Sequence, residues 1–291
     1  MDFLSKDYKR MDIEDLRMWI GRTVTVSDMV TPVPLIALAA TLDRDDAVPV
    51  RGDAVAPCWH WLYFLHVYRH SDTDVDGHLM RGGFLPPVPL PRRMWAAGRI
   101  EFLSLARVGQ SISRTSRILD VSFKEGRTGP LVFVKVQHRV LADGELAILE
   151  EQNIVYRGLP TSVEPEPPGI SEVGEFSWSR EVLPDEVLLF RYSALTFNSH
   201  RIHYDRPYAT QVEGYPGLVV HGPLIATLLL DLLRREIPAA QVLKFAFKAM
   251  KPIFDTAPFQ IYGRLEGDKT VKLWAVTPEG YLAMDATAEI A

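Results

Sequence analysis

The chain has 291 residues, of which 47% are hydrophobic and 24% are charged, with a formal net charge of −5. This length and composition are typical of a globular protein with one large domain or two modest ones, either able to bury a core. An acidic chain without a basic tail argues against nucleic acid as a partner. The single cysteine, Cys58, excludes a disulfide within the chain and predicts a reducing, cytoplasmic location.

No membrane partner is expected from the apolar segments. The first ten residues mix both charge signs and lack the apolar core of a signal peptide. The longest apolar run, residues 224–233, is interrupted by Thr227 and Asp231 and ends in basic residues. It is too short for a bilayer, which needs about 20 apolar residues.

Two short helices are predicted near the N-terminus. Residues 11–21 form the first, with Asp12 as its cap and Gly21 as its stop. Thr31 and Pro32 open the second, because proline fits a first helical turn. Residues 57–99 then form an irregular, aromatic and proline-rich span. It could be either a rigid cover over the core or one wall of a ligand tunnel.

An antiparallel meander follows. Residues 111–123, 131–140 and 145–156 are rich in β-branched residues and are separated by glycine-containing turns. Residues 158–169 contain four prolines and two glycines, which predict an extended linker.

The second half repeats this order. A helix over residues 185–195, a polar loop and an apolar helix over residues 223–235 precede four strands. These strands are predicted over residues 242–254, 259–266, 271–277 and 282–290.

The predicted fold class is therefore α+β, with an N-terminal unit (1–157), a linker (158–169) and a C-terminal unit (170–291). A helix that is apolar on nearly all faces must be buried on nearly all faces, and a curled antiparallel sheet can bury it. With about 14 residues, the apolar helix would be roughly 20 Å long, close to the width of four to five paired strands. Two such units could form one continuous sheet.

The polar loop before the apolar helix carries the candidate chemistry. Asn198, His200 and His203 lie close together in it. A histidine that titrates near neutral pH suits a general base. Gly222 starts the apolar helix, where a free backbone N–H and the helix dipole favour a developing oxyanion. The structural alternatives are a histidine bonded to a backbone carbonyl and a tight turn that enters a helix.

Residues 196–209, followed by residues 220–222, resemble the signature of the MaoC-like double hot-dog enoyl-CoA hydratases, including the itaconyl-CoA and mesaconyl-C4-CoA hydratases. The resemblance implies a double hot-dog fold and a hydro-lyase that needs no cofactor or metal, with coenzyme A as part of the substrate. It puts His203 at the catalytic histidine, Gly222 at the oxyanion glycine and Asn198 where an aspartate is usual. Since an amide cannot be a base, Asn198 is expected to hold the water that His203 deprotonates.

The resemblance further implies a short branched dicarboxylyl-CoA as substrate, either itaconyl-CoA or mesaconyl-C4-CoA, which hydration converts to citramalyl-CoA. Its free carboxylate would need a cation, and arginine binds carboxylates bidentately. The candidate substrate contacts are Arg201, Arg81, Arg92, Arg93, His200 and His221, and Lys244, Lys248 and Lys251 are candidates for the CoA phosphates.

Three other functions stay open. The chain could be a 3-hydroxyacyl-thioester dehydratase of fatty acid synthesis, an acyl-CoA thioesterase, or a non-catalytic acyl-CoA binding protein. A homodimer is possible, although a chain with two units does not need a partner to complete a site.

One acidic segment imitates a calcium loop. Residues 72–77 match its start, but Gly83 stands at the twelfth position, where the loop needs glutamate. His70 and His78 flank the segment without the cysteines or the helical spacing of a zinc site. No metal is therefore expected.

Overall fold

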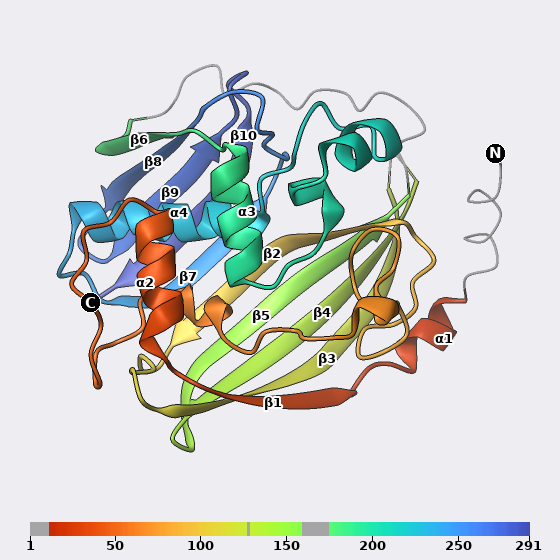
Figure 1. The fold of residues 1–291 in the computed structure, drawn as a ribbon, viewed down its shortest axis with the longest axis horizontal. Coiled ribbons are helices and arrows are strands. Elements are labelled where there is room, and N and C mark those ends of the chain that lie inside the picture. The colour runs from red at the N-terminus through yellow and green to blue at the C-terminus, as the bar shows by residue number, and fades with distance from the viewer. Residues whose placement is uncertain (1–11, 127–128, 159–174) are drawn as a thin grey trace.

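A single antiparallel sheet of ten strands runs through the molecule (Figure 1). The computed structural model describes residues 12–126, 129–158 and 175–291. The strand order is β1-β3-β4-β5-β2-β7-β10-β9-β8-β6. The strands of the N-terminal half are β1 (Thr23–Met29), β2 (Arg92–Phe102), β3 (Ser111–Gly126), β4 (Gly129–Ala142) and β5 (Glu145–Arg157). Those of the C-terminal half are β6 (Trp178–Val182), β7 (Val242–Ala249), β8 (Phe259–Glu266), β9 (Thr270–Val276) and β10 (Leu282–Ile290).

Four α-helices and several shorter helical turns accompany the sheet within the described ranges. The helices are α1 (Ile13–Arg17), α2 (Pro32–Thr41), α3 (Glu186–Leu195) and α4 (Gly222–Glu236). The turns are η2 (Trp59–Leu62), η3 (His70–Asp72), η4 (Arg201–His203) and η5 (Tyr208–Val212).

Both predicted N-terminal helices are confirmed. Asp12 caps α1, because its Oδ1 accepts the Glu14 N–H at 2.9 Å. Pro32 is the first residue of α2. The helices predicted at 185–195 and 223–235 correspond to α3 and α4, which are each shifted by a residue or so.

The strand predictions contain four errors. β1 and β6 were missed because both are edge strands with few buried side chains, so little apolar alternation marks them. The first part of β2 lies inside the span 57–99, which was predicted to be irregular. The strand predicted over 242–254 ends at Ala249, shortly before Pro252, which has no N–H to donate.

The helix α4 is the centre of the larger core. Every side chain from Leu224 to Leu233 is buried. The helix contacts β6, β8, β9 and β10, which curl around it as the apolar pattern predicted (Figure 1). A smaller apolar cluster lies between α1 and strands β3 to β5.

The two halves of the chain share one sheet, as expected. β2 pairs with β7 in a register that runs from Ala97–Lys248 to Glu101–Lys244. α2 and α3 pack against each other. The predicted linker lies outside the described residues apart from Gly158, so its extended form and the domain boundaries stay predictions. Within the described ranges no helix is long and apolar enough to span a membrane.

Candidate active site

The histidine loop (residues 196–205) begins with a sharp change of direction at the end of α3. The Asn198 N–H donates to the Ser193 carbonyl at 2.8 Å. Phe197, just before it, has a φ of 49°, which few non-glycine residues adopt. The loop then runs beside His221, the residue that precedes α4. The polar side chains of the loop therefore lie next to the N-terminus of the buried helix.

His203 is buried, and its two ring nitrogens have different environments. The distance from Nδ1 to the Val219 carbonyl oxygen is 2.7 Å, so Nδ1 must carry the proton and donate it. Nε2 is then the nitrogen with a free lone pair. Burial lowers the pKa of His203 from its ordinary value to about 4, which keeps the ring neutral. The bond to a backbone carbonyl and the role of base are thus compatible, because they use different nitrogens.

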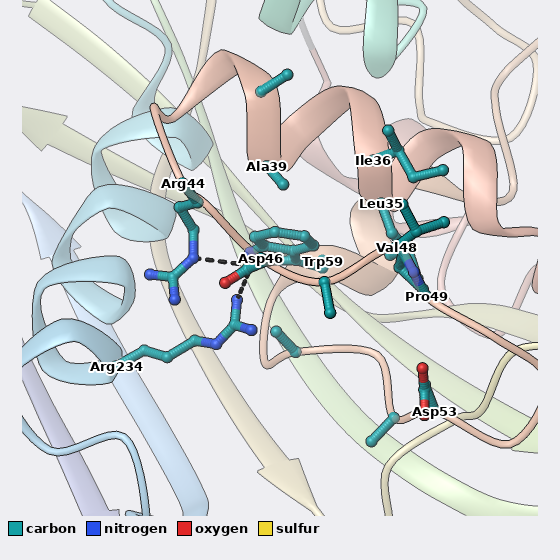
Figure 2. A pocket seen from close by; sticks show the side chains of 14 residues that line it. Leu35, Ile36, Ala39, Arg44, Asp46, Val48, Pro49, Asp53, Trp59 and Arg234 are labelled. Atoms are coloured by element: carbon teal, nitrogen blue, oxygen red, sulfur yellow. Dashed lines mark hydrogen bonds and ion pairs between the residues drawn. The ribbon is translucent and has the colours of Figure 1, made fainter.

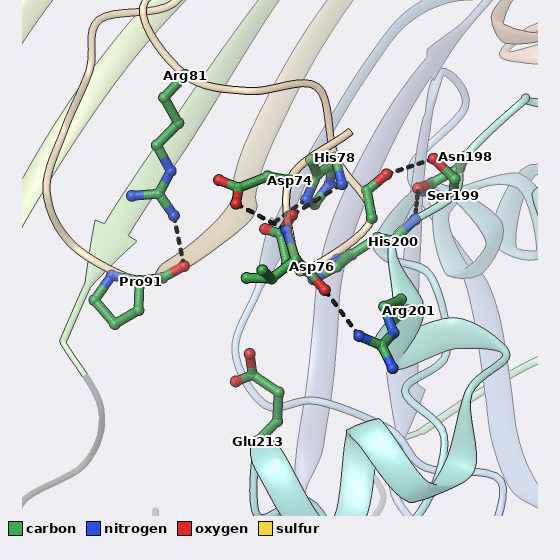
Figure 3. Close-up of polar contacts among 12 residues, drawn as sticks. Asp74, Asp76, His78, Arg81, Pro91, Asn198, Ser199, His200, Arg201 and Glu213 are labelled. Carbon is green, nitrogen blue, oxygen red and sulfur yellow. Dashed lines mark hydrogen bonds and ion pairs between the residues drawn. The ribbon is translucent and has the colours of Figure 1, made fainter. Parts of the chain in front are cut away.

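Asn198 is held by a local turn. Its Oδ1 accepts the His200 N–H at 3.0 Å (Figure 3). An amide oxygen has two lone pairs and the amide nitrogen has two donors, so one acceptor position and both donors remain for a water. The turn fixes the side chain that the sequence assigned to hold this water.

His221 and Gly222 form the other side of the site. The rings of His203 and His221 stack with their centroids 3.7 Å apart, and His221 Nε2 lies 2.8 Å from the Ser193 hydroxyl. Gly222 is the first residue of α4, and its N–H has no acceptor within the helix. A Cβ on Gly222 would meet one described heavy atom within 4 Å, the Trp95 carbonyl oxygen at 3.9 Å. The space beside the Gly222 Cα thus holds few protein atoms, so the backbone can be approached closely there.

The acidic loop (residues 72–78), which imitates a calcium loop in sequence, docks on the histidine loop. The Arg201 N–H donates to the Asp76 carbonyl at 2.9 Å. The Ser199 hydroxyl donates to the Gly77 carbonyl at 2.5 Å. Both predicted roles of the span 57–99 thus have a counterpart in the structure. Its turn η2 is buried in the core, whereas its acidic loop borders the candidate site.

A row of polar groups extends from the acidic loop to His203, and Figure 3 shows three of its members, Asp76, His78 and His200. Asp76 Oδ2 lies 3.0 Å from His78 Nδ1, and the His78 ring lies 4.0 Å from that of His200. The His200 ring is in turn 5.4 Å from that of His203. Burial lowers the pKa of His200 well below its ordinary value. The sequence left His200 without a clear role and did not connect Asp76 or His78 with the site.

Asp76, His78 and His200 also carry the atom types of a metal site. One ligand atom from each lies within 4.8 Å of the others. The two imidazole planes are inclined by only 39° at a centroid distance of 4.0 Å. His78 Nδ1 already lies within hydrogen-bond distance of Asp76 Oδ2, so these two groups satisfy each other without an ion.

Three of the four arginines that the sequence offered for a carboxylate are paired with protein oxygens. Arg81 donates to backbone carbonyls at 2.6 to 2.8 Å. Arg92 pairs with Glu213 at 3.1 Å, and Arg201 pairs with Asp205 at 2.7 Å. These three side chains hold the loops around the site together. The fourth is Arg93 on β2.

A hollow of about 480 Å³ lies away from the histidine loop, near the C-terminal end of α4 and beneath α2 (Figure 2). Its lining is largely apolar and includes Trp59. The Asp46 carboxylate in it pairs with Arg44 at 2.9 Å and with Arg234 at 3.0 Å. These charges compensate one another, and the residues that line the hollow include no histidine that could act as a base.

A continuous antiparallel sheet around a buried helix, with a histidine loop at the helix N-terminus, defines the MaoC-like double hot-dog hydratases and dehydratases. The chain belongs to the family of hydroxyacyl-thioester dehydratases type 2, whose model matches residues 58–255. It is thus a hydro-lyase of the enoyl-CoA hydratase type, as the sequence predicted.

Proteins that are similar to this chain in sequence or in structure support this family assignment. The chain is 46% identical to a mesaconyl-C(4)-CoA hydratase of Chloroflexus aurantiacus, over 96% of this chain and 99% of the relative. It is 27% identical to a mitochondrial hydroxyacyl-thioester dehydratase type 2 of Schizosaccharomyces pombe, over 82% of this chain and 89% of the relative. A Mycobacterium tuberculosis protein with a double hot-dog fold superposes with a TM-score of 0.56 at 12% identity, over 96% of this chain and 98% of that chain.

Proposed function

We propose that the protein hydrates a short branched dicarboxylyl-CoA, with mesaconyl-C4-CoA as the first candidate and itaconyl-CoA as the second. The hydratase of Chloroflexus aurantiacus, with 46% identity over nearly the whole chain, supports this choice of substrate. In mesaconyl-C4-CoA the β-carbon carries both a methyl group and the free carboxylate, and hydration there gives citramalyl-CoA.

In the proposed mechanism, His203 Nε2 takes a proton from a water that Asn198 orients. The water oxygen bonds to the β-carbon, and the electron pair of the double bond moves onto the thioester as an enolate. The Gly222 N–H stabilises the enolate oxygen, for which one such donor is typically worth about 10²–10³ in rate. The imidazolium then returns its proton to the α-carbon, so the net change is the addition of one water.

The observation that carries this proposal is the bond from His203 Nδ1 to the Val219 carbonyl. It fixes the tautomer whose Nε2 can act as a base. The burial of His203 keeps that nitrogen deprotonated at neutral pH. No cofactor is needed for this chemistry, since coenzyme A arrives with the substrate.

The test is a hydration assay with purified protein and three substrates: mesaconyl-C4-CoA, itaconyl-CoA and crotonyl-CoA. Loss of the enoyl-thioester absorbance measures turnover of mesaconyl-C4-CoA and crotonyl-CoA, and mass spectrometry identifies citramalyl-CoA formed from either dicarboxylyl thioester. We expect a dicarboxylyl thioester to give the highest kcat/KM. Absence of turnover with every substrate would rule out the proposed activity.

A 3-hydroxyacyl-thioester dehydratase is the second candidate, because the family model and the relative from Schizosaccharomyces pombe carry that description. It would use the same groups in the reverse direction on an acyl chain without a second carboxylate. A kcat/KM for crotonyl-CoA that exceeds those for both dicarboxylyl thioesters would favour it.

A further inference from the structure

Of the four candidate arginines, Arg93 is the one that stays available to bind a substrate carboxylate. Among the described residues, its guanidinium forms no ion pair with a carboxylate. Burial raises the pKa of the nearby Tyr156 hydroxyl, and Arg93 opposes this rise. Tyr156 is only 1% exposed and lies directly opposite Arg93 in the register of β2 and β5. The buried tyrosine thus supports an arginine that keeps donors free.

The position of Arg93 places it beside the candidate chemistry. It precedes by two residues Trp95, the residue whose carbonyl oxygen lies next to Gly222. After the larger effect of burial, the charge of Arg93 contributes to the lowered pKa of both His78 and His200. The guanidinium therefore acts on the same imidazole row that leads to His203.

A dicarboxylyl thioester brings a carboxylate to this place. In mesaconyl-C4-CoA the free carboxylate is bonded to the carbon that water attacks, so it must lie close to both His203 and Gly222. A carboxylate that enters a desolvated site is costly unless a cation pairs with it. Arginine presents donors in a planar fork that matches both carboxylate oxygens.

Resting on the function proposed above, we propose that Arg93 binds the free carboxylate of the acyl group and so selects dicarboxylyl-CoA thioesters over neutral enoyl-CoA thioesters. Tyr156 is a positioning residue that orients the fork. A second arginine of this region, Arg114, has the buried carboxylate of Glu150 nearby, which opposes the effect of burial on its pKa. Arg93 is the better partner because no carboxylate of the residues that the structure describes forms an ion pair with it.

The binding test uses two saturated thioesters that cannot be hydrated. Succinyl-CoA carries a free carboxylate and butyryl-CoA does not. In Arg93→Gln, we expect the Kd for succinyl-CoA to rise about 30-fold or more, as for other truncated charge pairs, and that for butyryl-CoA to change less than threefold. Isothermal titration calorimetry measures both. Arg99→Gln is the matched control, since Arg99 is exposed on the same strand.

Equal losses for the two thioesters, or no loss for either, would overturn the role of Arg93. If Arg93→Gln fails to fold by circular dichroism, Arg93→Lys serves instead, because it keeps the charge and loses the fork. We then expect the Kd for succinyl-CoA to rise by a smaller factor and the Kd for butyryl-CoA to stay unchanged. Equal losses of affinity for the two thioesters, or no loss for either, would again overturn the proposal.

The hydration assay separates this inference from the proposed function. In Arg93→Gln, kcat/KM should fall about 30-fold or more for mesaconyl-C4-CoA and stay within threefold for crotonyl-CoA. The parent protein could fail to hydrate dicarboxylyl thioesters while Arg93→Gln still loses affinity for succinyl-CoA and not for butyryl-CoA. In that case the proposed substrate is wrong and the carboxylate site stands. If the parent hydrates mesaconyl-C4-CoA and Arg93→Gln does so equally well, only the role of Arg93 is wrong.

Discussion

A Cβ atom on Gly77 would lie 1.9 Å from the Ser199 carbonyl oxygen, so two backbone segments from opposite halves of the chain touch at this point. Gly77 also has a φ of 91°, which favours glycine. The acidic loop can dock on the histidine loop only because no side chain stands between them. The conformation of the candidate site thus depends on a residue far from it in sequence.

Gly77→Ala should therefore displace the histidine loop. A shift of about 1 Å at reacting groups can cost about 10² in rate, and we expect a loss of kcat/KM of this order. The hydration assay measures it. Gly52→Ala is the matched control, because Gly52 has a φ of 95° with nothing within 4 Å of a Cβ. It should keep its activity, and near-parent activity in Gly77→Ala would show that the contact does not position the site.

His203→Gln should lower kcat by about 10²–10⁴, the usual contribution of a positioned base. Its fold should survive, because glutamine retains a donor for the Val219 carbonyl. Steady-state kinetics and circular dichroism test both points. His70→Gln changes an exposed histidine and should have no effect. Turnover by His203→Gln within a few-fold of the parent would remove His203 from the mechanism.

The sequence pointed to the candidate site residues that a local pattern encodes, and their catalytic roles stay predictions. His203, Asn198 and Gly222 lie within or beside one loop and one helix start, and the apolar pattern of α4 predicted a sheet wrapped around it. Asp76 and His78 were not predicted, because docking of distant loops brings them to the site. Their acidic segment only imitated the start of a calcium loop, which Gly83 at the twelfth position argued against.

The sequence also could not show which arginines are paired with protein oxygens. An arginine that donates to carbonyls has the same sequence appearance as a free one. Glu213, which neutralises Arg92, lies more than a hundred residues away. Only the folded arrangement separates these structural arginines from Arg93.

The pH dependence of catalysis should follow the burial of His203. Its pKa of about 4 means that the base is deprotonated at neutral pH and becomes protonated only as the pH approaches 4. We expect kcat/KM to be independent of this group above about pH 5 and to fall below it. A pH–rate profile checks this. An acid limb centred near 6.5 would show that His203 has its ordinary pKa.

The same shift links folding to pH. Between pH 4 and 6.5, the folded protein binds fewer protons at His203 than the unfolded chain does. The free energy of unfolding should therefore decrease as pH falls through this window, and the contribution is fully present above 6.5. Urea denaturation at pH 7.5 and 5.0 measures the change, and His203→Gln should lessen it. An equal pH dependence in parent and variant would contradict the shift.

Chelation should leave activity unchanged. His78 Nδ1 is already bonded to Asp76 Oδ2 at 3.0 Å, so the two groups satisfy each other without an ion. We expect kcat/KM after dialysis against EDTA to stay within twofold of the untreated value. A larger loss that Zn²⁺ restores would assign a metal to these residues.

The buried carboxylate of Asp231 should be a major determinant of stability. Its side chain is fully buried in α4 and pairs with Arg44 at 2.6 Å, Arg180 at 2.8 Å and Arg235 at 2.8 Å. Asp231→Leu would leave these guanidinium groups without their carboxylate, and breaking a buried pair typically costs about 3–5 kcal/mol. Urea denaturation should show a loss of this size.

Glu289→Gln provides the comparison for Asp231→Leu, since it breaks an exposed pair with Lys244. The loss of stability there should be below about 1 kcal/mol. Because Arg44 belongs to the N-terminal half and Asp231 to the C-terminal half, Asp231→Leu should also weaken the attachment of α2 to α4. Hydrogen exchange should then rise at α2 before it rises at β3 and β4. A loss of stability no greater than that of Glu289→Gln, with unchanged exchange at α2, would show that Asp231 does not join the two halves.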